Sequence, residues 1–184
     1  VAYAQAAVEA EVPILVGTTG FDTPQWKILR ECGESIPVLH GANFARGIQA
    51  LIDAVEAALA TIPEYDVEVT ETHHNAKRDA PSGTANVILE QVEAARDRDE
   101  GKRVHGRVGE QPRETGEIGV HARRAGDIAG EHEVLLAGND EALSLSHRAG
   151  SRAVFAEGAL DAATWLVEQS PGFYRFADIA EQLA

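Results

Sequence analysis

Two short apolar segments, each set between helix candidates, constrain the fold of this chain more than any other feature. One is VPILV at residues 12–16 and the other is IPVLH at residues 36–40. Apolar runs without alternation are typical of strands that are buried on both faces, as in parallel sheets covered by crossover helices. We therefore expect residues 1–63 to belong to an open α/β sheet of the doubly wound, Rossmann type.

The helix candidates around these strands support this arrangement. The chain opens with an alanine-rich helix that leads directly into the strand at 12–16. Residues 23–33 have helical spacing, with Thr23 as the expected N-cap and Pro24 at the first helical position, and residues 48–62 form an amphipathic helix. Because a sheet of this kind does not usually begin with such a helix, we expect earlier strand and helix units to be missing from the chain.

The character of the sequence changes after Pro63. Residues 66–74 alternate between polar and apolar side chains, which is the pattern of a half-exposed strand. Further elements follow: strands at 117–127, 131–138 and 141–150, helices at 82–97, 152–169 and 174–184, and a loop at 97–116. We expect residues 64–170 to form an α+β domain with a mixed, mainly antiparallel sheet, and residues 171–184 to form a helix that packs back on the nucleotide-binding part.

The composition argues against several classes of function. Asp and Glu total 30 against 16 Lys and Arg, whereas a nucleic-acid partner requires clustered positive charge. We find no apolar run of the roughly 18 residues that a membrane span needs, no signal-peptide pattern, and a single cysteine, Cys32. We therefore expect a cytoplasmic protein. Its three lysines beside 13 arginines indicate either adaptation to high salt or a high-GC genome with an acidic surface.

The segment ETHHNAKRDAPSGTA at residues 71–85 concentrates the chemistry of the chain. A strand ends at His73 and His74, a turn carries the rare Lys77, and a helix begins at Ser82, Gly83 and Thr84. The first N–H groups of a helix have no partners within it, and the helix dipole adds positive potential there. Together with the lysine ammonium, this helix start is suited to hold a carboxylate or a phosphate.

Three roles for the two histidines compete. A metal site is disfavoured because neighbouring side chains of a strand point to opposite faces and no HExxH pattern lies nearby, so we predict no metal. A structural role, with the rings hydrogen-bonded to a loop, stays open. The third role is acid–base and anion-binding chemistry near neutral pH. A nucleophilic mechanism lacks its signature, because Ser82 has no GxSxG context and Cys32 has no basic partner nearby in the sequence.

The segment at 71–85 resembles the signature of the dihydrodipicolinate reductases, approximately E-x-H-H-x-x-K-x-D-A-P-S-G-T-A. Four further blocks match that family in order and spacing: VGTTGF at 16–21, ANFARG at 42–47, RRAGDIAGEHEV at 123–134 and LSHRAGSRAVFAEGAL at 145–160. The resemblance implies an enzyme of the diaminopimelate route to lysine. Such an enzyme uses NADH or NADPH to reduce a cyclic imine with two carboxylates, 4-hydroxy-tetrahydrodipicolinate, and works as a homotetramer built through its C-terminal sheet.

The resemblance also implies a role for individual residues. His73 matches the proton donor and acceptor, and Lys77 matches a second proton donor. The other implied contacts are His74, Gly83 and Thr84 for the substrate, Arg152 as an anion contact, and Gly17, Thr18, Thr19, Gly41, Ala42, Asn43 and Phe44 for the cofactor.

Two departures from the family pattern affect these expectations. Asn75 and Ala76 replace basic residues that many members carry between the second histidine and the lysine. The phosphate-binding G-x-G-x-x-G loop is absent from the sequence, and the choice between NADH and NADPH depends on residues near that loop. We therefore expect the 184-residue chain alone to bind NAD(P)H poorly. A non-catalytic oligomerising or ligand-binding module is the alternative to a reductase.

Overall fold

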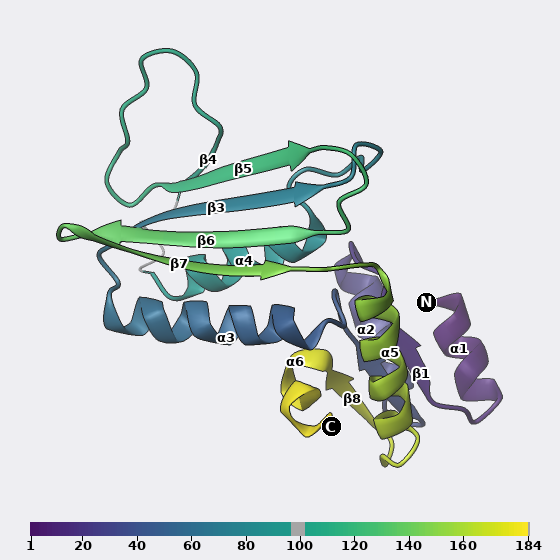
Figure 1. Ribbon diagram of the computed structural model, residues 1–184. Coiled ribbons are helices and arrows are strands. Elements are labelled where there is room, and N and C mark those ends of the chain that lie inside the picture. Colours follow the sequence, from purple (N-terminus) through teal and green to yellow (C-terminus); the bar gives the residue numbers. More distant parts are fainter. Residues whose placement is uncertain (97–101, 184) are drawn as a thin grey trace. The chain divides into compact units, whose positions relative to one another are not determined.

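The computed structural model describes residues 1–96 and 102–183, and these divide into two compact units (Figure 1). The first unit combines both ends of the chain, Val1–Gln49 and Ala153–Ala184, and the second is Ala50–Arg152. The helix expected at 152–169 therefore groups with the N-terminal segment rather than with the α+β part. The roles assigned to residues 1–63, 64–170 and 171–184 remain a proposal.

The first unit is a small parallel sheet covered by helices. Its strands, in the order β1-β2-β8, are β1 (Ile14–Val16), β2 (Pro37–His40) and β8 (Gly172–Arg175). Its helices are α1 (Ala2–Glu9), α2 (Thr23–Cys32), α5 (Ala153–Leu166), α6 (Phe176–Ile179) and a 3₁₀ turn, Ala180–Gln182. The expected doubly wound arrangement of parallel strands and helices is confirmed.

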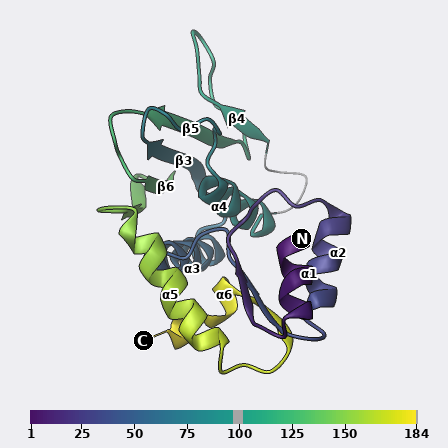
Figure 2. The same ribbon diagram turned by 90° about the vertical axis from the view of Figure 1, so that its right-hand side faces the viewer.

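Successive residues of β2 show that this sheet is covered on both faces. Val38 and Leu39 are both 0% exposed, and they belong to different apolar clusters. Val38 packs with residues of α1 and α2, which lie side by side in Figure 2, and Leu39 packs with residues of α5 and α6. Because both faces of β2 are buried, the strand has no polar face, which is why it reads as an unbroken apolar run.

Two local predictions for this unit were wrong. The cap of α2 is Asp22, whose side chain accepts the Gln25 N–H at 2.8 Å while the Gln25 side chain accepts the Asp22 N–H in return. The segment at 174–184 is not one helix, because Gly172–Arg175 is a strand that pairs with β2 and the helix begins only at Phe176. A four-residue strand carries too little pattern of its own, and the neighbouring strand stabilises it.

The second unit is a five-stranded sheet with helices on one face (Figures 1 and 2). The strand order is β4 (Arg103–His105), β5 (Ile118–Arg124), β3 (Asp66–His73), β6 (Glu131–Gly138) and β7 (Glu141–Arg148). The helices are α3 (Arg46–Thr61), whose residues 46–49 belong to the first unit, and α4 (Gly83–Ala94).

The sheet is mixed, as predicted, but the described strands form two parallel and two antiparallel pairings rather than mainly antiparallel ones. Strand β4 lies within the segment expected to be a loop at 97–116, of which residues 97–101 fall outside the described part of the chain. Within residues 1–96 and 102–183, none of the helices combines the length and the apolar character that a membrane span requires.

We predict that Gly158→Ala in α5 destabilises the first unit. A Cβ at Gly158 would lie 1.8 Å from the carbonyl oxygen of Phe44, so the helix or the loop would have to move. Overpacking of this kind costs about 1–3 kcal/mol, which exceeds the gain of about 1 kcal/mol that alanine normally brings to a helix. Thermal unfolding should show a melting temperature lowered by several degrees, about 2–4 °C for each kcal/mol.

Gly150→Ala is the matched control, because a Cβ there would meet nothing within 4 Å. An unchanged melting temperature for Gly158→Ala would contradict the close approach of α5 to Phe44.

Candidate functional site

The buried carboxylate of Glu71 is the centre of the polar cluster in the second unit. Glu71 is 1% exposed on β3 and accepts two hydrogen bonds from the Arg124 guanidinium, at 2.7 and 2.8 Å. It also accepts the Ser82 N–H at 3.1 Å. Burial alone would raise the pKa of the Glu71 carboxyl, but the hydrogen bonds from Arg124 and His73 outweigh it and lower the pKa. Glu71 is therefore held as a carboxylate.

His73 is oriented by this carboxylate. Its Nδ1 lies 2.5 Å from Glu71 Oε2, and because a carboxylate only accepts hydrogen bonds, Nδ1 carries the proton. The other ring nitrogen, Nε2, lies beside Gly130, where a Cβ would come within 3.1 Å of it. Gly130 thus keeps the space next to Nε2 clear of a side chain.

The start of α4 has the geometry that the sequence predicted. Ser82 is the N-cap, and its Oγ accepts the Ala85 N–H at 3.1 Å. Gly83 is the first helical residue and is half-buried, while the Thr84 side chain is largely buried, with 8% exposure. The helix start is therefore fixed to the same carboxylate as His73, through the Ser82 N–H.

Positive charge gathers around His74. The pKa of His74 is lowered, first by burial and then by the positive charges of Arg152, His73, Lys77 and Arg124. Lys77 itself bonds Asp79 at 2.9 Å, and this hydrogen bond lowers the pKa of the Asp79 carboxyl. The predicted Arg152 thus lies near enough to His74 to act on its charge. A site with neutral His74 and several cations around it favours an anionic ligand.

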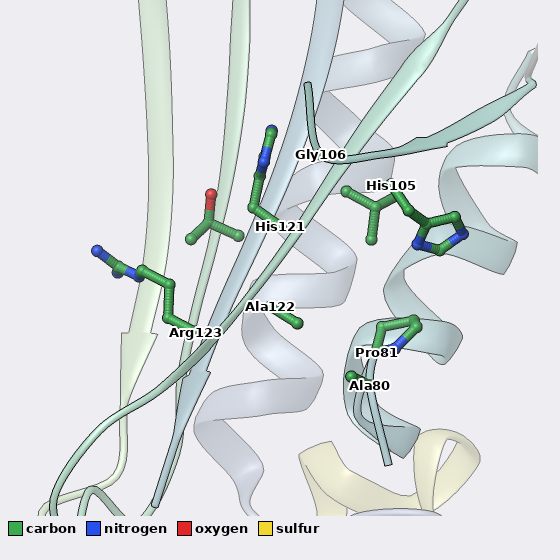
Figure 3. Close-up of a pocket in the computed structure, with 9 residues that line it drawn as sticks. Ala80, Pro81, His105, Gly106, His121, Ala122 and Arg123 are labelled. Atoms are coloured by element: carbon green, nitrogen blue, oxygen red, sulfur yellow. The ribbon is translucent and has the colours of Figure 1, made fainter. Parts of the chain in front are cut away.

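A broad hollow of about 870 Å³ lies beside this cluster, lined by the end of β4 and by residues 120–123 of β5 (Figure 3). His121 and Arg123 point to one side of β5, whereas Ala122 points towards Ala80 and Pro81 on the other side. The hollow includes none of the predicted catalytic or substrate-binding residues. Its lining residues do not indicate a particular reaction or ligand, so the polar cluster around Glu71 stays the candidate site.

No group of three or more His, Cys, Asp or Glu side chains that could hold a metal occurs in the described part of the chain.

The predicted cofactor residues lie in the first unit, on two turns at the carboxyl ends of the adjacent parallel strands β1 and β2. Residues 17–20 are exposed, and His40 Nε2 lies 3.0 Å from the Thr18 carbonyl oxygen, which joins the two turns. Asn43 Oδ1 accepts the Ala45 N–H. The Phe44 ring is 7% exposed and packs on Phe176, so this residue can offer a ligand little beyond its backbone.

Gly41 permits the packing behind these turns. A Cβ there would lie 2.8 Å from the Phe44 ring and 2.9 Å from Phe176.

Three residues of the polar cluster were not singled out from the sequence: Glu71, Arg124 and His132. One signal for Glu71 was available, because Val67, Val69, Glu71 and His73 share one face of β3 and the first two are core residues. A carboxylate in phase with core positions indicates a buried, partnered charge. Arg124 and His132 come from strands whose pairing partners only the structure identifies.

Comparisons with known proteins point to one family. Residues 47–180 match the family described as dihydrodipicolinate reductase, C-terminus. The chain is 59% identical over 176 residues to the 4-hydroxy-tetrahydrodipicolinate reductase of Natronomonas pharaonis, covering 96% of this chain and 71% of that protein. It is 56% identical over 178 residues to the corresponding reductase of Haloarcula marismortui, covering 97% and 70%.

Both of these relatives are haloarchaeal, which agrees with the salt-adapted interpretation of the acidic composition. A solved structure, a dipicolinate-bound dihydrodipicolinate reductase from a Paenisporosarcina species, superposes with a TM-score of 0.74 at 24% identity. It covers 97% of this chain and 68% of that one, and it supports the fold. The family match and the two haloarchaeal relatives show that this chain belongs to the dihydrodipicolinate reductase family.

Proposed function

We propose that this chain contributes the substrate site and the acid–base groups of an NAD(P)H-dependent 4-hydroxy-tetrahydrodipicolinate reductase in lysine biosynthesis. The observation that carries the proposal is the shared carboxylate of Glu71. It fixes both the Nδ1–H tautomer of His73 and the Ser82 N–H at the start of α4. A proton-transfer group and an anion-binding helix start are thereby held in one rigid cluster.

His73 acts as the proton donor and acceptor. With Nδ1 bonded to Glu71, Nε2 is the nitrogen that exchanges a proton with the substrate. The carboxylate fixes the tautomer of the ring and keeps the ring from turning. Lys77 acts as a second proton donor, and its ion pair with Asp79 holds the side chain in place.

The remaining residues hold the two carboxylates of the substrate. The backbone N–H groups at Gly83 and Thr84 receive one carboxylate at the start of α4. His74 and Arg152 contribute to the positive potential that receives the other carboxylate. The solved relative whose fold this chain shares was determined with dipicolinate, a dicarboxylate, bound.

The two turns of the first unit fit a nicotinamide dinucleotide. Gly17, Thr18 and Thr19 present exposed backbone, and Gly41, Ala42, Asn43 and Phe44 form the neighbouring turn at the carboxyl edge of the sheet. NADH or NADPH bound there would supply the hydride for the reduction.

We also propose that the protein forms a homotetramer through the five-stranded sheet. In the described part of the chain, helices cover one face of this sheet, and the opposite face carries Leu135 of β6 between Glu68 and Ser144 of the neighbouring strands. A half-covered sheet with an apolar side chain on its open face is suited to pack against a second copy. A purely oligomerising or ligand-binding module is the alternative function.

The acid–base role predicts a specific loss of rate. In a chimera that joins this chain to the part of the Natronomonas reductase outside the matched region, His73→Ala should lower kcat by about 10²–10⁴. Lys77→Ala should reduce substrate affinity or the same step without changing the Kd of the cofactor. Oxidation of NADPH or NADH in the presence of substrate measures both.

His105→Ala, which changes an exposed histidine of β4, is the control, and a chelator should leave the rate unchanged. An undiminished rate for His73→Ala would mean that this histidine is structural. Loss of activity on addition of the chelator would support a metal site.

The proposed assembly predicts an effect of charge on the open face. Leu135→Arg should convert the tetramer into smaller species, because it places a charge in the contact between sheets. Light scattering coupled to size-exclusion chromatography measures the mass. Leu160→Arg on α5, where the leucine is 68% exposed, should keep the tetramer. A tetramer that survives Leu135→Arg would place the contact elsewhere.

A further inference from the structure

His132 is a buried histidine that the proposed mechanism does not use. It is 3% exposed on β6, directly opposite Glu71 of β3, and its Nε2 lies 3.1 Å from Ser82 Oγ. Its ring meets the His73 ring edge to face, with centroids 5.2 Å apart. Its Nδ1 is buried and has no hydrogen-bond partner among the described residues. His132 therefore contacts both the cap of α4 and the proton-transfer ring.

The hydrogen-bond count decides which atom holds the proton. Ser82 Oγ already accepts the Ala85 N–H. If His132 Nε2 also donated to Ser82, the Ser82 proton and the Nδ1 lone pair would both be left unsatisfied. If Ser82 donates to Nε2 instead, only the Nδ1–H of His132 is unsatisfied. The second arrangement leaves fewer buried groups without partners, so it is the more stable one.

We propose that His132 is a positioning residue, which accepts the Ser82 hydroxyl proton and so fixes the helix start where a substrate carboxylate binds. This inference rests on the proposed function. With its proton donated to His132, the Ser82 hydroxyl is held in the one rotamer that leaves a lone pair for the Ala85 N–H. The N–H groups of Gly83 and Thr84 are then presented in a fixed direction. The contact of His132 with the His73 ring also fixes the position of that ring relative to the start of α4.

A neutral His132 is required for this role, and its surroundings keep it neutral. The groups that act on its charge are His73 and Glu71 of β3, His147 of β7 and Lys77. Burial has the largest effect, and it lowers the pKa of His132 from 6.5 to about 4, with the cations outweighing the single carboxylate. The Nε2 lone pair is thus available to Ser82 at neutral pH.

Binding of a dicarboxylate tests the role of His132 without any cofactor. Isothermal titration of the 184-residue chain with pyridine-2,6-dicarboxylate should give a Kd that rises about three- to tenfold in His132→Phe, which keeps a ring but removes the acceptor. His132→Gln, whose amide oxygen can accept from Ser82, should restore the affinity to within about twofold. In a Ser82→Ala background, His132→Phe should raise the Kd almost no further, because the hydroxyl that donates to His132 is already absent.

His147→Phe is the matched control, since His147 lies opposite His132 on β7, whereas the ring that contacts Ser82 Oγ is that of His132. Equal effects of His132→Phe with and without Ser82 would overturn the inference and leave the proposed function standing. Absence of dicarboxylate binding by the unsubstituted chain would overturn both.

A measurement on the unsubstituted chain covers the case in which His132→Phe does not fold. The ¹⁵N chemical shifts of the His132 ring should report a neutral Nδ1–H tautomer with an unprotonated, hydrogen-bonded Nε2 from pH 5 to pH 8. A protonated Nε2 in this range would overturn the assignment of the Ser82 proton.

The same proton arrangement predicts how stability depends on pH. The unfolded chain binds a proton on His132 below pH 6.5, whereas the folded chain does not do so until about pH 4. Stability should therefore fall as the pH falls from 6.5 to 4, and urea midpoints measured in this window should fall less in His132→Gln. An equally steep loss in that variant would show that His132 is not held neutral.

Discussion

The buried carboxylate of Glu71 is the interaction on which the candidate site depends. An ionised side chain that is 1% exposed is tolerated only where donors replace the water that it loses. Here the donors come from three places: the Arg124 guanidinium of β5, the His73 ring of β3, and the Ser82 N–H just before α4. Removal of any one donor would leave part of the charge uncompensated. The strand order and the helix position are thus coupled to a single ion.

The Glu71 carboxylate serves two parts of the site, the His73 ring and the start of α4. His73 needs one ring nitrogen fixed and the other free, and the carboxylate supplies that asymmetry because it can only accept. The helix start needs its N–H groups directed outwards, and the bond from the Ser82 N–H to Glu71 anchors it. One buried charge therefore orients a proton donor and an anion site. The positive groups around His74 are more exposed and act mainly through the local potential.

Much of the fold could be predicted from the sequence, because its elements have strong local patterns. The unbroken apolar runs at 12–16 and 36–40, the helical repeat near 48–62 and the alternation at 66–74 are each visible within the element itself. The predictions that were wrong concern elements without such support. Strand β8 is formed by pairing with β2, and that pairing cannot be read from residues 172–175 alone.

The residues of the candidate site also divide into those that a local pattern identifies and those that only strand pairing brings to the site. His73, Lys77 and the helix start lie within fifteen consecutive residues, so local reasoning and family resemblance could identify them. Arg124 and His132 reach the cluster from β5 and β6, which pair with β3 on its two sides. No spacing in the chain encodes that neighbourhood. The side chains that orient the chemistry are therefore harder to predict than those that perform it.

The pairing of β3 has a consequence for how this protein can change. β3 runs parallel to β5 and antiparallel to β6, so its register is fixed independently on both edges. Side chains alternate along a strand, and a shift of one residue would turn Glu71 and His73 to the far face and bring Thr70 and Thr72 in their place. Insertions or deletions within this strand would thus erase the site while leaving the apolar composition intact. Of the two connections that flank this strand, the one after it carries His74, Lys77 and Ser82, so a change of length there would disturb the site as well, whereas the connection at 62–65 carries none of the site residues.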